Sequence, residues 1–140
     1  MRQIIASFFT REVLWLKGLG TLYVLAIPLT HLNLPEAYVW PLAFFFLAAM
    51  LFTYPLAAWA EGRFLGLETA ISLGLIILGA IGLALAPALL IAAIFGHGVW
   101  DLFKHRGHGI PFFGWYVSGC VVVDWLYAAA LSFYYLSGVP

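Results

Sequence analysis

"ETAISLGLIILGAIGLALAPALLIAAIFGHGVWDLFK", residues 68–104, is the stretch that decides the fold. As one helix it would be roughly 55 Å long, at about 1.5 Å per residue. A hydrocarbon core about 30 Å thick needs only about 20 helical residues, so the stretch is too long for one crossing. Pro87 suits the first turn of a new helix. The stretch therefore predicts two antiparallel membrane helices joined by a tight apolar hairpin, "LALAP", at residues 83–87.

The composition of the whole chain agrees with a membrane location. Of its 140 residues 65% are hydrophobic and only 9% are charged, whereas a soluble domain carries about 25% charged residues. The net charge is zero, which gives no electrostatic basis for binding nucleic acid. The single cysteine, Cys120, excludes an internal disulfide and a zinc site built from cysteines. We expect an uncleaved first membrane segment, because no small-residue cleavage site follows the first apolar run.

Hydrophobic segments of sufficient length predict an all-α bundle with five transmembrane helices, forming one domain over residues 1–140. The predicted spans lie near residues 13–32, 37–60, 67–85, 87–104 and 113–136. With a cytoplasmic N-terminus, the basic residues all fall in or beside the segments that face the cytoplasm: Arg2, Arg11, Lys17, Arg63, Lys104 and Arg106. This distribution follows the positive-inside rule and favours a bacterial inner-membrane protein of this orientation.

Polar residues concentrate in the last two predicted spans. His97, Asp101 and His105 follow one another at intervals of four residues, which places them along one side of a helix. Cys120 and Asp124 have the same spacing in the last span. The short connection between the two spans predicts an antiparallel pair, so we expect His97, Asp101, Cys120 and Asp124 to face one another.

An ionised Asp124 side chain is energetically unfavourable at its predicted depth in the membrane. It lies roughly 16 Å into its span, near the middle of the bilayer. An ionised Asp at the centre of a membrane helix costs about 2.5–3.5 kcal/mol on insertion scales, so this carboxyl group must be protonated, paired or bound to a cation. Ionisable residues within a membrane are by default a functional-site hypothesis.

Three interpretations of this polar group are open. In the first it is a metal site, because nitrogen and oxygen ligands of this kind suit zinc, iron or manganese. The ligands would be His97, Asp101, His105 and Asp124, with Glu61 and Glu68 near enough in the predicted topology to complete a shell. Such a site can activate water or oxygen.

In the second interpretation the same groups form a metal-free polar network that fixes the helix register or relays protons. The expected partners are Lys104 or Arg106 for Asp101, and His97 or Tyr116 for Asp124. In the third, the chain binds a lipid, quinone or pigment. Lys104, His105 and Arg106 would then hold an anionic headgroup, or His97 or His31 would be an axial ligand to haem or a chlorin.

The pattern "HGVWDLFKHRGHGIP…WY…GC…D" in the last third of the chain resembles a group of small, uncharacterised bacterial integral membrane proteins. The matching residues are His97, Trp100, Asp101, His105, Pro111, Cys120 and Asp124. Lys104 stands where some of those proteins have a second adjacent histidine. The resemblance implies a shared polar site, and it assigns no chemistry to that site.

These observations favour a metal-binding membrane protein, with a small metal-dependent enzyme acting on a lipid-like substrate as its extension. In the proposed roles His97, Asp101 and His105 ligate the metal, Asp124 is a ligand or proton acceptor, and Trp100 closes the site. Asp124 and His97 are the expected catalytic residues. The alternatives are a non-enzymatic subunit or assembly factor of a larger membrane complex, and a proton-coupled carrier. The expected partners are membrane lipids and either further copies of the chain or other membrane subunits.

Overall fold

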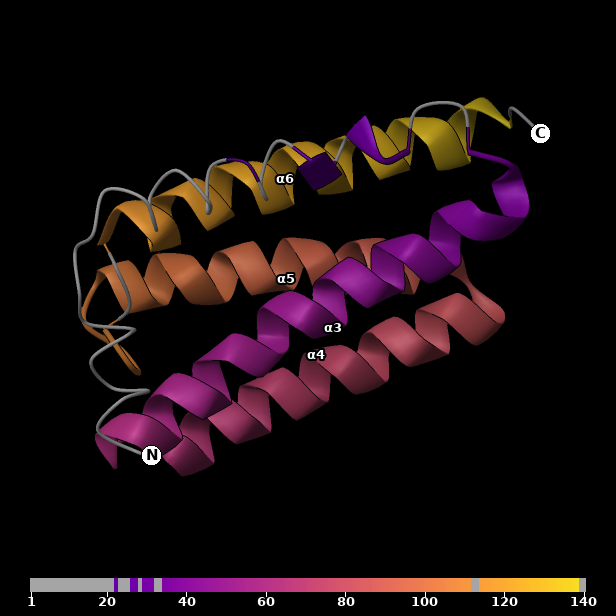
Figure 1. Ribbon diagram of the computed structural model, residues 1–140. Coiled ribbons are helices and arrows are strands. Elements are labelled where there is room, and N and C mark those ends of the chain that lie inside the picture. The colour runs from indigo at the N-terminus through magenta and orange to yellow at the C-terminus, as the bar shows by residue number, and fades with distance from the viewer. Residues whose placement is uncertain (1–21, 23–25, 28, 32–33, 112–113, 139–140) are drawn as a thin grey trace.

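The structure is a computed structural model that describes residues 22, 26–27, 29–31, 34–111 and 114–138 (Figure 1). The described residues contain four long helices and no strand. The helices are α3 (Glu36–Glu61), α4 (Leu65–Leu85), α5 (Pro87–His105) and α6 (Gly114–Ser137). The predicted first span, near residues 13–32, lies largely outside the described residues.

The all-α prediction is confirmed for the described part of the chain. All four helices are long and apolar enough to cross a membrane, and each covers one of the spans predicted after the first. These four helices are typical of a membrane protein. A fifth crossing and the orientation of the N-terminus stay predictions.

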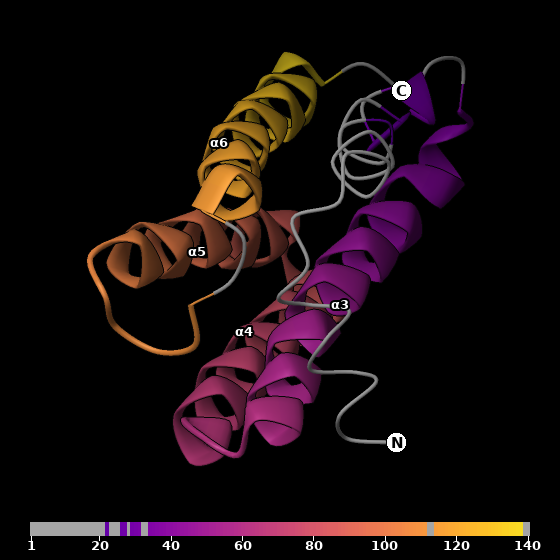
Figure 2. The same ribbon diagram turned by 60° about the vertical axis from the view of Figure 1, so that its left-hand side comes forward.

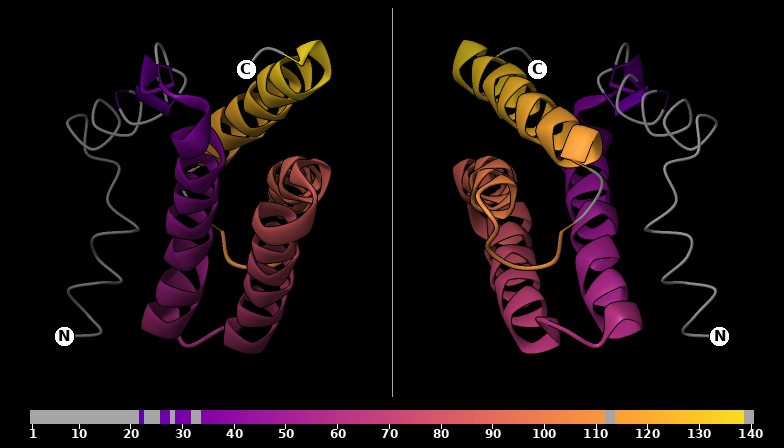
Figure 3. Two further views of the ribbon diagram at one scale, coloured as in Figure 1. Left: turned by 90° about the vertical axis from the view of Figure 1, so that its right-hand side faces the viewer. Right: turned by 90° about the vertical axis from the view of Figure 1, so that its left-hand side faces the viewer.

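Helix α5 is central to the arrangement. It packs extensively against α4 and α6 and also contacts α3, while α3 packs mainly against α4. Figures 1 and 2 show α6 lying along α5 on the side away from α4. In Figure 3, α4 and α5 follow one another on one side of the bundle, with α3 opposite. The α3–α4 and α5–α6 connections lie at the same end of the bundle (Figure 1).

The predicted hairpin between α4 and α5 is confirmed. Ala86 has extended backbone angles, and Pro87 is at the start of α5, where its missing N–H leaves no helical hydrogen bond unmade. Gly82 lets the two helices approach closely, since a Cβ atom there would overlap the backbone of Leu90. Small residues at a membrane helix interface have this role because lipid provides no hydrophobic force that pushes helices together.

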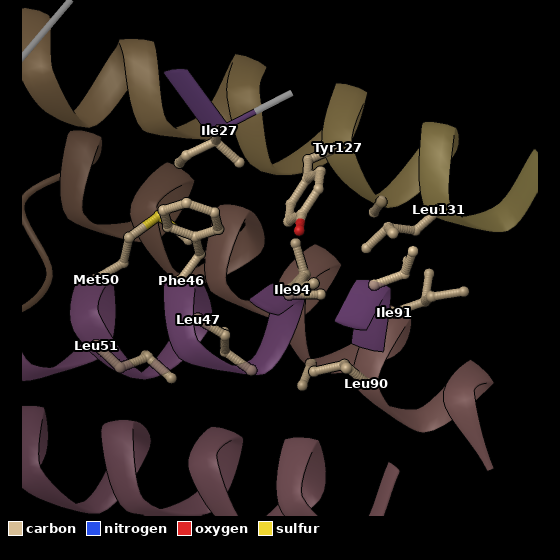
Figure 4. Close-up of a cluster of buried hydrophobic side chains, with 14 residues drawn as sticks. Ile27, Phe46, Leu47, Met50, Leu51, Leu90, Ile91, Ile94, Tyr127 and Leu131 are labelled. Atoms are coloured by element: carbon tan, nitrogen blue, oxygen red, sulfur yellow. The ribbon is translucent and has the colours of Figure 1, made fainter. Parts of the chain in front are cut away.

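The main apolar core lies between α3, α5 and α6. Its buried side chains include Phe46, Leu47 and Met50 from α3, and Leu90 and Ile94 from α5. Figure 4 shows Tyr127 of α6 pointing into this cluster, and Ile27, from the segment before α3, lying against it. The core occupies the half of α5 before His97 and leaves the half after it to polar side chains.

Helix α3 contains a proline that removes one helical hydrogen bond, and a side chain of α4 supplies a replacement. Pro55 has no N–H, so the carbonyl of Leu51, four residues earlier, lacks its usual helical donor. The hydroxyl of Ser72 in α4 donates to this carbonyl at 2.9 Å, in a buried position. An unsatisfied carbonyl in a membrane is expensive, so Ser72 both permits Pro55 and fixes the register of α4 against α3.

Candidate metal centre

One face of α5 carries three buried polar side chains. His97, Asp101 and Lys104 are spaced i, i+4, i+7, which is the repeat of a single helix face. His97 and Asp101 are completely buried and Lys104 is nearly so. Because α5 is surrounded by α3, α4 and α6, this face points into the bundle rather than toward lipid.

His97 binds Asp124 of α6. Its Nδ1 lies 2.8 Å from Oδ2 of Asp124, and both side chains are fully buried. An ionised carboxylate only accepts hydrogen bonds, so with Asp124 ionised Nδ1 of His97 is the donor in this contact. The expected contact between these two spans is therefore present, although 27 positions separate the two residues.

Asp101 completes a compact group with the same histidine. Its Oδ2 lies 4.0 Å from Nε2 of His97, and donor atoms of His97, Asp101 and Asp124 all lie within 4.8 Å of one another. Among the described residues, Nε2 of His97 and Oδ1 of Asp124 have no hydrogen-bond partner. The Asp101 carboxylate accepts no hydrogen bond of good geometry, although the Tyr54 hydroxyl interacts with it.

The chemistry of this group suits a divalent cation. When ionised, the two buried carboxylates carry two negative charges, and burying charge without a counter-charge is strongly unfavourable. One imidazole nitrogen with carboxylate oxygens is a ligand set used for zinc, iron and manganese. The His97, Asp101 and Asp124 cluster can therefore hold a metal ion.

Gly98 allows α5 and α6 to meet at the level of this cluster. A Cβ atom at Gly98 would lie 2.7 Å from Nε1 of Trp125 and 3.1 Å from Cβ of Asp124. A side chain at this position would push the two helices apart. The short His97–Asp124 contact thus depends on the absence of a side chain one residue after His97.

The structure places His105 outside the group that holds the other three predicted ligands. His105 is exposed at the end of α5. Each step of four residues rotates a position by about 40° around a helix, so two steps rotate it by about 80°. Arg106 is also exposed just beyond the helix. Of the residues expected to hold an anionic headgroup, Lys104 alone is buried.

Lys104 belongs to a second buried cluster, centred on Glu68 of α4. Glu68 is fully buried, and its Oε2 accepts from Lys104 Nζ at 2.5 Å and from Trp100 Nε1 at 3.1 Å. Its Oε1 accepts from the backbone N–H of Ile110 at 2.7 Å. The pairing of Lys104 with Asp101 and the role of Glu68 in a metal shell, both expected from the sequence, are replaced by this ion pair. Trp100 ties α5 to α4 through the same carboxylate.

The loop after α5 is shaped to reach Glu68. Gly109 has a φ of +77°, a left-handed conformation that favours glycine. A Cβ atom there would also lie 2.6 Å from Oε1 of Glu68. Glycine at this position lets the loop turn so that the N–H of Ile110 reaches the buried carboxylate.

Tyr54 of α3 joins the two clusters, and no sequence pattern distinguishes it from the other tyrosines. The Nζ of Lys104 lies 3.2 Å from the centre of its ring, a cation–π geometry. The ring centres of Tyr54 and His97 are 5.7 Å apart, and the Tyr54 hydroxyl interacts with Asp101. The polar side chains of α5 therefore form one continuous buried region with partners on α3, α4 and α6.

Two other predicted residues lie elsewhere. Cys120 is buried one turn before Asp124 and is not among the grouped donor atoms. His31 lies beside α6, where its Nε2 is 2.8 Å from the Tyr127 hydroxyl and its Nδ1 is 3.0 Å from the carbonyl of Ile27. Both ring nitrogens of His31 have protein partners. The bond to Tyr127 attaches the segment before α3 to α6.

Comparisons with protein-family models, curated proteins and solved structures give no match to this chain.

Proposed function

We propose that this chain is a multi-pass protein of a bacterial inner membrane that binds one divalent transition metal, zinc, iron or manganese. The site is formed by His97, Asp101 and Asp124. The observation that carries the proposal is the close grouping of three fully buried donor side chains from two helices.

Each residue has a distinct part in the proposed site. His97 presents Nε2, which has no hydrogen-bond partner among the described residues, toward Asp101. With the metal on Nε2, Asp124 accepts a hydrogen bond from Nδ1 and fixes the orientation of the ring, as carboxylates commonly do for metal-binding histidines. Asp124 is the third donor when the metal takes the place of the Nδ1 proton, because the two ring nitrogens point away from each other. A neutral histidine, two carboxylates and a divalent cation sum to zero charge, which is the favourable state in a low-dielectric interior.

The proposed site is of the catalytic kind. Three protein donors leave a coordination position for water or substrate, as in zinc enzymes. An apolar groove of about 590 Å³ lies between α5 and α6, and its lining includes Trp125, the residue after Asp124, but none of the three donor residues. The proposal therefore includes a small metal-dependent enzyme that acts on a lipid-like substrate.

Elemental analysis of the detergent-purified protein tests the metal proposal. We expect about one transition-metal ion per chain, because a preorganised buried site retains its metal during purification. Prolonged treatment with a chelator should remove the metal and lower the thermal unfolding temperature, since the ion stabilises the folded state by binding it. Protein that carries no metal, and that is not stabilised by added Zn²⁺, Fe²⁺ or Mn²⁺, would contradict the proposal.

The proposed topology has the N-terminus and the α3–α4 and α5–α6 connections in the cytoplasm. Arg63, Lys104 and Arg106 all belong to that end of the bundle. The described residues of the opposite end, 34–36, 85–88 and 135–138, contain no Lys or Arg. The positive-inside rule then assigns the basic end to the cytoplasm and the end of α6 to the other side.

Single cysteines test this orientation, in a background where Cys120 is replaced by alanine. Ser137→Cys, at the exposed end of α6, should react with a membrane-impermeant maleimide in intact cells. His108→Cys, in the exposed loop after α5, should react only after the membrane is permeabilised. The reverse labelling pattern would assign the opposite orientation.

A second candidate function is that of a non-enzymatic subunit or assembly factor. The observation in its favour concerns α4, of which only Glu68, Ser72, Gly79 and Gly82 are buried. Its exposed apolar side chains, such as Leu73, Ile77 and Ile81, can contact lipid or another membrane protein. A metal-free chain that purifies in a fixed ratio with one partner would favour this second function over the first.

A further inference from the structure

We infer that the buried Glu68–Lys104 ion pair sets the metal affinity of the His97, Asp101 and Asp124 site, with Glu68 holding the Lys104 ammonium group away from Asp101. This inference rests on the proposed metal-binding function and names residues that regulate the same site. Neither Glu68 nor Lys104 is a metal ligand in it.

The geometry makes Lys104 the cation that can compete with a metal. Lys104 is the next residue after Asp101 on the buried face of α5. The two side chains are three residues apart on the same buried helix face, so they are neighbours on α5. The Lys104 ammonium group lies over the ring of Tyr54, and the hydroxyl of the same tyrosine interacts with Asp101. A modest rotation of the flexible lysine side chain would carry its charge from Glu68 across this ring toward Asp101.

Glu68 holds Lys104 in place with a complete set of partners. Its carboxylate accepts from Lys104, from the indole of Trp100 and from the backbone of Ile110. The last two donors fix the carboxylate between α5 and the following loop. Lys104 therefore meets a rigid, fully buried acceptor, and its charge is neutralised where it lies.

The balance of charge determines whether each substitution raises or lowers the metal affinity. The Glu68–Lys104 pair is neutral, so it neither attracts nor repels a divalent cation strongly. If Glu68 loses its charge, the ammonium group is left unpaired, and it pairs with Asp101 or repels the metal. If Lys104 loses its charge, Glu68 contributes an additional negative charge near the site. The two changes should therefore alter metal affinity in opposite directions.

Metal titration of the full-length protein in detergent, with Zn²⁺ or Mn²⁺ as the probe, measures both changes. In Glu68→Gln we expect the dissociation constant to rise at least about tenfold, because one buried charge interaction of this size changes a binding constant by that factor. In Lys104→Met we expect it to fall. In the double variant, where no unpaired charge is left, we expect a value near that of the wild type.

Arg63→Met is the matched control, since it removes an exposed positive charge that is paired with Glu61 and belongs to neither buried cluster. We expect its affinity to stay within a few-fold of the wild type. A merely structural pair would weaken metal binding in both single variants, and this result would overturn the inference while leaving the metal site intact. Equal affinity in all variants would overturn it too. If the wild type binds no metal, the proposed function and the inference fail together. If one single variant does not fold, the affinities of the other single variant and of the double variant are compared with that of the wild type.

Discussion

The His97→Ala variant is expected to lose metal affinity by about a hundredfold or more, whereas His105→Ala keeps the affinity of the wild type. Both variants remove one imidazole from α5, and the two residues are two turns apart. His97 is fully buried, and its nitrogens face both carboxylates. Removing even an indirect partner of a metal site costs about 10- to 100-fold in affinity, so removing the central ligand costs at least as much. Metal titration of the two purified variants measures the difference.

The same two variants test whether the ligands follow the sequence spacing or the structure. The spacing of His97, Asp101 and His105 predicts both histidines as ligands, whereas in the structure only His97 lies in the buried cluster. Loss of the metal in His105→Ala would contradict the proposed ligand set. Asp124→Asn provides an intermediate case. It keeps the shape of the side chain and its acceptor for Nδ1 of His97, but it removes one charge, so we expect a smaller loss than in His97→Ala.

The second large effect is on stability, in the Glu68→Leu variant. Removing one partner of a buried ion pair costs about 3–5 kcal/mol, because the other charge is left buried without compensation. Glu68→Leu leaves the Lys104 ammonium, the Trp100 indole and the Ile110 N–H without their acceptor. We expect the free energy of unfolding in mixed detergent micelles to fall by this amount. Adding Lys104→Met should recover part of the loss, because it removes the unpaired charge while the Trp100 indole and the Ile110 N–H still lack an acceptor.

Glu61→Leu is the control for this prediction. Glu61 ends α3 and pairs with Arg63 at 3.3 Å, and both side chains are partly exposed. Ion pairs of this kind contribute about 0–1 kcal/mol, since water solvates the charge that is left. We expect Glu61→Leu to change the unfolding free energy by less than about 1 kcal/mol. Equal losses in the two variants would show that Glu68 and Lys104 are not buried together.

Local properties of the sequence predicted the helices of the described region well. The start of α5 at Pro87 depends on the missing N–H of one residue, and the ends of α3, α4 and α6 depend on the length of each apolar run. The neighbouring positions of His97 and Asp101 also follow from the helix repeat alone. The contact between His97 and Asp124 was predicted because a short loop constrains α5 and α6 to be neighbours.

Other features depend on how the helices rotate against each other. His105 is excluded from the site because four-residue steps drift around a helix. The pairing of Glu68 with Lys104 joins residues 36 positions apart, and Tyr54 enters from a third helix. No local sequence pattern predicts which face of α3 or α4 packs against the rest of the bundle.

The sequence by itself determined that this chain folds into apolar helices of membrane-crossing length, where they begin and end, and that histidine and aspartate concentrate in the last two. Helix formation and membrane crossing depend on hydrogen bonds and hydropathy within a few residues, so the sequence is sufficient for them. Apart from the contact between His97 and Asp124, only the tertiary structure decided which polar groups meet. That choice is made by close contacts between helices, at Gly98 against Trp125 and at Ser72 against the carbonyl of Leu51, because such contacts fix rotation and register between segments far apart in the chain.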